Sequence, residues 1–411
     1  MTCSRRILVT AAMFGLLWGP TPAARAQGSE PDSVVAAHGR TTTEPDSEAA
    51  SPVDYLWVLR GSLANRAGVD SVIARATRMR VRGLLVQVVG RGDACYRSEV
   101  LPRAEFIDRN EGAEFDPFGE LVGRAHEAGI EVHAWVNCLL VWSKPHRPRD
   151  PRHVVNAHPE WIAQLRDGRT MAALGARERS RKGVEGVFLS AGHPGVQKWL
   201  AAVAQEIAER YPVDGIHLDY IRHPSVGVGW DPTTRARFAL DAGVDPAHME
   251  QLDTAAQTKV HEAWESFQRT QVTAVVRAMR DSARAVRPRI VISAAVIADT
   301  LRAESSNAQM WRSWVRDGLI DRAFVMCYGV PVQSVMNQLM GFTAELETGG
   351  SVVPGIAMYN TKPVTAALKI KGARAMGFPL VALYSYDSLF EERNYWDALK
   401  AQFEPGALGS R

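Results

Sequence analysis

A short apolar segment that ends in an aspartate is the clearest candidate for chemistry in this sequence. Residues 214–219 read Asp-Gly-Ile-His-Leu-Asp, and a polar stretch that Pro224 closes follows them. Because side chains alternate across a β-strand, Gly215, His217 and Asp219 share one face. If the strand lines a closed barrel, Asp219 lies at its carboxyl-terminal rim, where barrel enzymes hold their reacting groups. The segment therefore favours a carboxylate-dependent hydrolase that acts on a glycan.

A second carboxyl group is needed, because glycoside hydrolysis generally uses two, one on each side of the scissile bond. Three aspartates compete: Asp93 in a glycine-bracketed loop, Asp299 after the fifth expected strand, and Asp387 after two tyrosines near the end of the chain. Each has a structural alternative, since a loop aspartate can fix its own loop or cap the next helix. Glu304 lies further out and is assigned to the surface. The sequence leaves the choice among the three aspartates open.

Polar and aromatic side chains that suit a sugar follow the other expected strands. Aromatic rings cover the apolar faces of a pyranose, while amides and carboxylates bind its hydroxyls. Arg222 could neutralise Asp219 or bind a substrate carboxylate, and rim tyrosines could instead complete the core. The expected substrate-binding residues are Asn137, His217, Tyr220, Arg222, Arg91, Tyr328, Tyr359, Tyr384 and Tyr386.

Neither a metal nor an organic cofactor is expected. His133, His217 and Asp219 could be assembled into a metal site, but no His-x-His pair or His-rich loop supports one. Serine or cysteine nucleophiles lack an elbow motif. Whether Cys95 and Cys138 form a disulfide does not follow from the sequence.

The elements that must position these residues form an alternating pattern. From Pro52 onward, eight apolar runs alternate with helix-period segments, which is typical of βα units with a parallel sheet. The sequence therefore predicts an α/β protein with a single (β/α)₈ TIM barrel and long loops after strands three and four. A doubly wound open sheet lacks its usual Gly-rich first turn here. The expected strands cover residues 55–59, 83–89, 130–137, 214–219, 290–297, 322–328, 352–359 and 379–386.

Helix signals lie between these runs. Asp116 and Pro117 provide a capping acid and a first-turn proline for a helix that ends at Gly129. The other main helices are expected over residues 70–80, 194–210 and 255–287, and a Trp-rich helix contains Trp311 and Trp314.

The N-terminus has the pattern of an export signal. Arg5 and Arg6 precede an apolar run from Ile7 to Trp18, and residues 24–26 supply a small-x-small cleavage pattern. The run is too short to span a bilayer, so no stable membrane insertion is expected. We predict a signal peptide over residues 1–26, a flexible segment over 27–51 and the barrel over 52–405. Cleavage near Ala26 would release a periplasmic or extracellular protein.

The length and net charge of the chain limit the classes of binding partner that we expect. The chain has 411 residues, of which 46% are hydrophobic and 23% charged, and its formal net charge is only +3. Such mild charge gives no reason to expect nucleic acid as a partner. The oligomeric state does not follow from the sequence.

Several motifs occur in a fixed order along the expected barrel. The strongest is Tyr-Pro-Val-Asp-Gly-Ile-His-Leu-Asp-Tyr-Ile-Arg at residues 211–222. The others are Arg-Gly-Asp-Ala at 91–94, His-Ala-Trp-Val-Asn at 133–137, His-Pro-Glu-Trp at 158–161, Gly-His-Pro at 192–194, Trp-Arg-Ser-Trp at 311–314, Met-Cys-Tyr at 326–328 and Tyr-Ser-Tyr-Asp at 384–387. With these motifs the chain resembles glycosyl-hydrolase-like family 10, a bacterial group of exported (β/α)₈ proteins, over residues 52–392.

That family in turn resembles the α-amylase-type barrels, whose fourth strand carries an Asp-Gly-x-Arg-x-Asp pattern with the nucleophile at its final Asp. His217 occupies the Arg position here. The resemblance implies that Asp219 is the nucleophile, or stabilises the oxocarbenium ion, in a retaining mechanism. It does not assign the general acid. Cys95, Arg97, Cys138 and His223 depart from the family's usual residues, and none replaces a candidate carboxyl.

The sequence thus predicts an exported glycoside hydrolase that cleaves O-glycosidic bonds in a cell-envelope glycan. Peptidoglycan strands are the first expectation and an α-glucan is the second, so a poly- or oligosaccharide is the expected partner. One alternative is a non-catalytic glycan-binding barrel, with no acid within reach of a sugar over Asp219. The other is a metal-dependent polysaccharide hydrolase such as a deacetylase.

Overall fold

The structure is a computed structural model, and it describes residues 51–107, 111–224, 226–343, 350–391 and 394–404. The signal peptide expected over residues 1–26, and nearly all of the flexible segment expected over 27–51, lie outside the described residues. In the described ranges, no helix combines the length and the apolar character that crossing a membrane requires.

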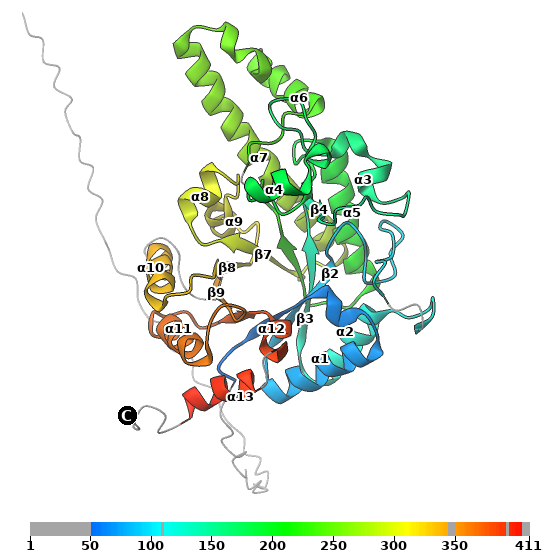
Figure 1. Ribbon diagram of the computed structural model, residues 1–411, viewed down its shortest axis with the longest axis vertical. Coiled ribbons are helices and arrows are strands. Elements are labelled where there is room, and N and C mark those ends of the chain that lie inside the picture. Colours follow the sequence, from blue (N-terminus) through cyan, green and yellow to red (C-terminus); the bar gives the residue numbers. More distant parts are fainter. Residues whose placement is uncertain (1–50, 108–110, 225, 344–349, 392–393, 405–411) are drawn as a thin grey trace, which may run out of the picture. The chain divides into compact units, whose positions relative to one another are not determined.

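Eight parallel strands form a closed barrel at the centre of the described chain (Figure 1). Around the barrel they follow the order β1-β10-β9-β8-β7-β6-β3-β2. The (β/α)₈ barrel predicted from the alternating pattern is confirmed, and every expected apolar run contains one of its strands. These are β1 (Tyr55–Val58), β2 (Gly83–Val89), β3 (Glu131–Asn137), β6 (Gly215–Asp219), β7 (Val291–Ile297), β8 (Arg322–Cys327), β9 (Val352–Ala357) and β10 (Ala382–Tyr384).

Large side chains fill the barrel interior. Tyr55 and Trp57 of β1, Trp135 of β3 and Phe324 of β8 are buried in one cluster there. Inward positions of a closed barrel are packed in layers, so the interior is a core and not a pore. This packed interior supports the side chains at the carboxyl-terminal ends of the strands.

Gly215 makes room for a histidine in the layer beside it. A Cβ atom at this position would lie 2.2 Å from Nδ1 of His133, so any larger residue would displace that ring. Alternation along β6 then turns His217 and Asp219 to the same side as Gly215. Asp219 pairs in register with Asn137 at the ends of β6 and β3. The strand β6 therefore places the carboxyl of Asp219 at the carboxyl-terminal rim of the barrel.

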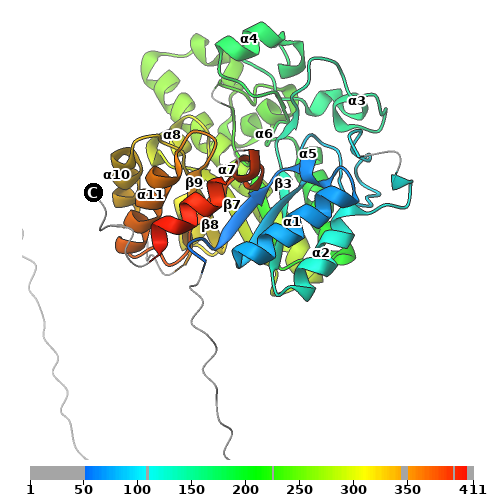
Figure 2. The same cartoon turned by 60° about the horizontal axis from the view of Figure 1, so that its bottom comes forward.

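Helices lie outside the strands, and several begin at the caps that the sequence indicates (Figure 2). Asp116 accepts a hydrogen bond from the backbone N–H of Gly119 where α2 begins. The first helix begins before residue 70, because the side chain of Asn65 caps it. Among the helices are α1 (Arg66–Met79), α2 (Pro117–Glu127), α5 (Pro194–Arg210), α7 (Thr254–Val286), α9 (Trp311–Arg316), α10 (Val332–Thr343), α11 (Pro363–Ala375) and α13 (Tyr395–Lys400).

The two long insertions follow β3 and β6, as expected. The sequence predicts a long loop after the third strand, but the structure shows an antiparallel pair within it, β4 (Leu140–Trp142) and β5 (Val187–Phe188). Strands of two and three residues are too short to reveal themselves by alternation. The same insertion holds α3 (Val154–Ala157) and α4 (Ala176–Arg181), and the second holds α6 (Pro232–Ala242).

Candidate active site

A cavity of about 910 Å³ is lined by the carboxyl-terminal ends of the strands and the loops that follow them. Its volume is in the range of sites that enclose organic ligands. It leaves out four of the residues that the sequence proposes for the site, namely Asp93, Asp299, His217 and Tyr386. The proposed residues that do line it are Asp219, Asp387, Arg91, Asn137, Tyr220, Arg222, Tyr328, Tyr359 and Tyr384.

Asp219 lines this cavity although only 8% of its surface is exposed. Its Oδ2 accepts a hydrogen bond of 3.1 Å from the indole Nε1 of Trp135, and its Oδ1 accepts one of 2.6 Å from the backbone N–H of Tyr220. Tyr220 has a φ of 47°, a left-handed conformation that favours glycine. Strain of this kind gathers at functional sites. Both carboxyl oxygens are thereby held in one orientation.

Burial raises the pKa of Asp219 to about 6. Loss of hydration is the largest cause, and the hydrogen bonds from Tyr220 and Trp135 together with the charge of Arg222 offset only part of it. A carboxyl with a strongly shifted pKa in a cleft is a mark of a functional site.

His217 lies one layer deeper and does not reach the cavity. Its Nε2 accepts a hydrogen bond of 3.0 Å from the indole N–H of Trp57, and its Nδ1 lies 2.9 Å from Oγ of Ser293. Burial lowers the pKa of His217 well below its ordinary value, so the ring is neutral and donates from Nδ1 to Ser293. The structure places His217 in the packed interior, away from any bound sugar.

Asp93 forms a bidentate ion pair with Arg60. The two Nη atoms of Arg60 lie 2.6 and 2.7 Å from the two carboxyl oxygens. Burial alone would raise the pKa of Asp93, but the hydrogen bonds and charge of Arg60 outweigh it and lower the pKa. Arg60 engages both oxygens of Asp93, and Asp93 does not line the cavity, so the geometry is that of a loop anchor.

Asp299 is exposed and caps a short helix, α8 (Thr300–Ser305). Its Oδ1 accepts a hydrogen bond of 3.0 Å from the backbone N–H of Arg302. The helix-capping alternative therefore describes the position of Asp299, and the structure does not bring it to the cavity.

Asp387 lines the cavity and belongs to α12 (Tyr386–Glu391). Its Oδ2 accepts a hydrogen bond of 2.9 Å from the backbone N–H of Leu59, and its Oδ1 accepts one of 2.8 Å from Oγ of Ser62. Burial raises its pKa. The carboxyl ties the end of the barrel to the loop after β1, and both of its oxygens are engaged in doing so.

Three tyrosines form an aromatic wall of the cavity. The rings of Tyr328 and Tyr384 stack with their centroids 5.3 Å apart, and Tyr359 meets Tyr384 edge to face at 6.2 Å. Tyr359 is 59% exposed, so it offers a ring to a ligand. Burial raises the pKa of Tyr384 to about 12, which keeps its hydroxyl protonated. Tyr386 instead packs on Phe390 and accepts a hydrogen bond from Arg75.

An ion pair between Arg222 and Glu185 completes another part of the lining. Nη2 of Arg222 lies 2.8 Å from Oε1 of Glu185, and the guanidinium group lies 4.9 Å from the ring centre of Tyr220. Sequence reasoning missed Glu185. The available signal was a carboxylate between Gly183 and Gly186 inside a segment that the sequence predicts as irregular.

Asn137 and Arg91 occupy the β2–β3 side of the cavity. Asn137 donates a hydrogen bond of 2.9 Å to the carbonyl oxygen of Gly90 and accepts one of 3.3 Å from Gln87. Arg91 donates from Nε to Oγ of Ser143 at 2.8 Å. Within the described ranges no carboxylate is ion-paired with Arg91, so its guanidinium group is open to an anionic ligand.

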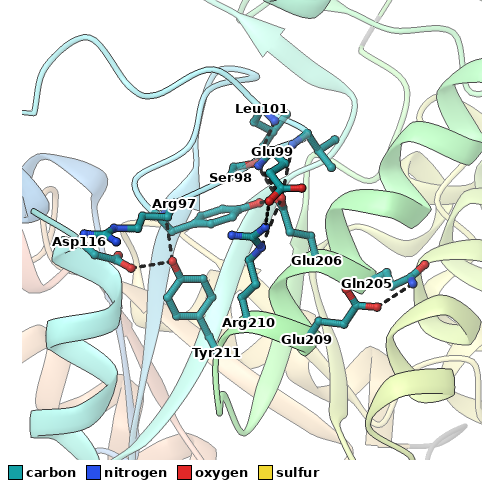
Figure 3. Close-up of polar contacts among 12 residues, drawn as sticks. Arg97, Ser98, Glu99, Leu101, Asp116, Gln205, Glu206, Glu209, Arg210 and Tyr211 are labelled. Carbon is teal, nitrogen blue, oxygen red and sulfur yellow. Dashed lines mark hydrogen bonds and ion pairs between the residues drawn. The ribbon is translucent and has the colours of Figure 1, made fainter. Parts of the chain in front are cut away.

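The loop that carries Arg91 is fixed from behind by a buried carboxylate, Glu206 of α5 (Figure 3). Its Oε2 accepts hydrogen bonds from the hydroxyls of Tyr96 and Ser98 at 3.1 and 2.6 Å. Its Oε1 accepts one of 2.6 Å from the backbone N–H of Glu99. These hydrogen bonds hold the loop in one position against α5.

The described residues contain no group of three or more histidine, cysteine, aspartate or glutamate side chains placed to hold a metal ion. His217 in particular has both ring nitrogens in hydrogen bonds with other side chains. Cys95, Cys138 and Cys327 are buried and free, so Cys95 and Cys138 do not form a disulfide.

Comparison with known proteins connects this geometry to a family. Residues 53–348 match the family model described as glycosyl hydrolase-like 10, which confirms the expected resemblance. Glycosyl hydrolase DigH of Escherichia coli (strain K12) is 28% identical over 172 residues, which cover 39% of this chain and 35% of DigH. Glycosyl hydrolase YngK of Bacillus subtilis (strain 168) is 22% identical over 166 residues, which cover 39% of this chain and 29% of YngK. The matched segment spans about a third of these curated relatives.

Solved structures share the fold at low identity. The glycoside hydrolase domain of PgaB (BpsB) from Bordetella bronchiseptica superposes with a TM-score of 0.65 at 14% identity, over 87% of this chain and 99% of that domain. An α-L-fucosidase from Paenibacillus thiaminolyticus gives a TM-score of 0.55 at 13% identity, over 85% of this chain and 48% of that enzyme.

Proposed function

Because the chain belongs to the glycosyl hydrolase-like 10 family, we propose that it hydrolyses O-glycosidic bonds with Asp219 as a catalytic carboxyl. One observation carries the proposal: a buried carboxyl, with its pKa raised to about 6, lies in a cavity of about 910 Å³ with a wall of tyrosine rings. A carboxyl is needed because the glycosidic transition state develops positive charge at the anomeric carbon. The tyrosine rings would hold the sugar over it.

We assign to Asp219 the nucleophile role that the resemblance to α-amylase-type barrels implies. Ionised Asp219 would attack the anomeric carbon while a second carboxyl protonates the leaving oxygen, so the configuration would be retained. The hydrogen bonds from Trp135 and Tyr220 support this role, because they hold the carboxylate in one orientation before the reaction.

The pH dependence of kcat/KM tests the nucleophile role. A nucleophile must be ionised, so activity should rise with pH with a midpoint near the pKa of Asp219, about 6. If Asp219 donated the proton instead, activity would fall with pH through the same range. A falling limb near pH 6 that disappears in a variant of Asp219 would therefore contradict the nucleophile role.

The substrate that we propose is a cell-envelope glycan, with peptidoglycan strands first and an α-glucan second. Arg60, Arg91 and Arg222 all line the cavity. Arg60 and Arg222 are each paired with a carboxylate, whereas Arg91 has no such partner among the described residues. The lactyl carboxylate of a muramic acid would supply an ion-pair partner for Arg91, which favours peptidoglycan over a neutral glucan as the substrate.

A non-catalytic glycan-binding barrel is the second candidate. It is favoured by the positions of Asp93 and Asp299, because an ion pair holds one and the other caps an exposed helix. Such a protein would keep the tyrosine wall and Asn137 and would bind glycans without cutting them.

Sugar release by wild type and by Asp219→Asn separates these functions. We expect wild type to release sugar from purified peptidoglycan strands or from an α-glucan, and Asp219→Asn to be slower by about 10³-fold or more. Asp299→Asn is the matched control, because it changes an exposed aspartate outside the cavity to another good helix cap. Equal release by wild type and Asp219→Asn would remove Asp219 from the mechanism. Binding without release by either protein would establish the glycan-binding function.

A further inference from the structure

We infer that Glu185 is the second catalytic carboxyl of this cavity and donates the proton to the leaving oxygen. The inference rests on the hydrolysis at Asp219 proposed above. It assigns the second role to a residue of the insertion after β3, and not to one of the three aspartates that follow barrel strands.

The carboxyls that line the cavity within the described ranges are Asp219, Glu185, Asp387 and Glu391. Asp387 has both oxygens engaged, by the N–H of Leu59 and the hydroxyl of Ser62. Glu391 lies at the other end of α12 and acts on the pKa of Asp387. Glu185 remains as the candidate that lies near Asp219.

Electrostatics support this closeness. The negative charge of Glu185 contributes to the raised pKa of Asp219 and to that of Tyr220. A like charge disfavours the ionised form of a nearby carboxyl. Glu185 and Asp219 therefore interact across the cavity that both line.

The contacts of Glu185 leave it free to exchange a proton. Its Oε1 is paired with Arg222, and no described residue binds its Oε2 through a hydrogen bond or ion pair. Its side chain is 36% exposed, so water can reload it after each turnover. A general acid must reach the leaving oxygen with a carboxyl oxygen that is not already engaged, and Oε2 of Glu185 meets this requirement.

The insertion builds a rigid support for this residue. Glu185 lies two residues before β5, and the neighbouring Gly186 packs against β4 so closely that a Cβ atom on it would lie 2.2 Å from the carbonyl oxygen of Trp142. On the other side, Arg222 pairs with Glu185 and rests on the ring of Tyr220, the residue after Asp219. A continuous set of contacts thus connects the two carboxyls.

The proposed reaction balances within these groups and one water molecule. In the first step the bond between the anomeric carbon and the leaving oxygen breaks, Glu185 gives its proton to that oxygen, and Asp219 forms an ester with the anomeric carbon. In the second step water attacks this carbon, the ester bond breaks and a proton returns to Glu185. The ester removes the charge of Asp219, so Glu185 can take the proton of the attacking water in the second step.

The test compares Glu185→Gln with wild type on two substrates. One is the glycan that wild type cleaves, and the other is the 2,4-dinitrophenyl glycoside of the sugar on the non-reducing side of the cut bond. Dinitrophenolate leaves without a proton, so its release does not need an acid. We expect kcat/KM to fall by about 10²–10⁴-fold on the glycan and by less than about tenfold on the aryl glycoside.

Two further variants make the result specific. Glu178→Gln is the matched control, because Glu178 lies in the same insertion, pairs with Arg169 and is outside the cavity lining; it should match wild type on both substrates. Asp387→Asn tests the rival residue. If Asp387→Asn loses much more activity on the glycan than on the aryl glycoside and Glu185→Gln does not, the inference is overturned.

A structural role for Glu185 predicts a different pattern. If Glu185 only holds Arg222 in place, Glu185→Gln should lose activity equally on both substrates, and Arg222→Met should lose it in the same way; that result overturns the inference. If Glu185→Gln cleaves the glycan at the wild-type rate while Asp219→Asn loses activity, the role of Glu185 is refuted and the proposed hydrolysis at Asp219 stands. If wild type cleaves neither substrate, the proposed hydrolysis fails and the role of Glu185 fails with it.

Discussion

The carboxyl of Asp219 gives up hydration to lie beside Trp135, and the folded protein is destabilised when this carboxyl ionises. Burial raises its pKa from 3.8 to about 6, so between these pH values the folded chain keeps a proton that the unfolded chain has released. Because the unfolded state binds fewer protons in this window, the free energy of unfolding falls as pH rises through it. Above the window the loss is constant, on the order of 3 kcal/mol.

Asp219→Asn should therefore stabilise the protein at pH 8 more than at pH 4.5. The amide cannot ionise, so the variant avoids a penalty that reaches about a third of its full size at pH 4.5 and is complete at pH 8. We expect the gain in the free energy of unfolding to be larger by about 2 kcal/mol at pH 8, as measured by urea denaturation at both pH values. An equal change at the two pH values would show that Asp219 is not desolvated in the folded protein.

At the scale of elements, the loop after β2 depends on α5. Glu206 accepts hydrogen bonds from two hydroxyls and from the backbone of that loop (Figure 3). The same loop carries Arg91, which lines the cavity. A buried acceptor that loses part of its capacity leaves donors unpaired, and each unpaired donor costs about 1–3 kcal/mol.

Glu206→Gln should lower the free energy of unfolding by about 1–3 kcal/mol and raise KM, because the amide turns a donor toward hydroxyls and N–H groups that need acceptors. Urea denaturation and steady-state kinetics measure the two effects. Glu209→Gln provides the comparison, since Glu209 is exposed on the same helix and accepts a hydrogen bond from Gln205. Similar losses in both variants would show that Glu206 has no special role in the loop.

At the scale of the whole molecule, the closed barrel places residues from distant parts of the chain around one cavity. Arg60 follows β1, Asp219 ends β6 and Tyr384 ends β10, yet all three line it. Strand ends converge in this way because parallel strands of a barrel share one direction. The proposed hydrolysis of an envelope glycan requires that the chain is exported.

Export therefore gives a prediction for the full chain. When all 411 residues are expressed in a bacterium, we expect the mature protein to begin near Gln27, because a basic start, an apolar run and a small-x-small site precede it. Intact mass of the protein from the periplasmic fraction or the medium measures this. Deletion of residues 7–18 should keep the protein in the cytoplasm at its uncleaved length. Wild-type protein found uncleaved in the cytoplasm would contradict the prediction.

The sequence by itself determined the barrel and the position of Asp219. Both depend on local patterns: apolar runs that alternate with helix-period segments, and a period of two that turns His217 and Asp219 to one face. The family followed from motifs that were readable in order along the chain. None of these inferences required knowledge of which distant segments touch.

Only the tertiary structure decided which carboxyls could accompany Asp219. Asp93, Asp299 and Asp387 look alike in the sequence because each follows an apolar run, yet one pairs with Arg60, one caps its own helix and one binds the loop after β1. Two of those three partners lie far away in the chain. Glu185 was hidden for the same reason, since its contact with Arg222 joins two insertions and a two-residue strand leaves no periodic signal. The surroundings of Asp219 are a set of long-range contacts, and local patterns cannot encode these.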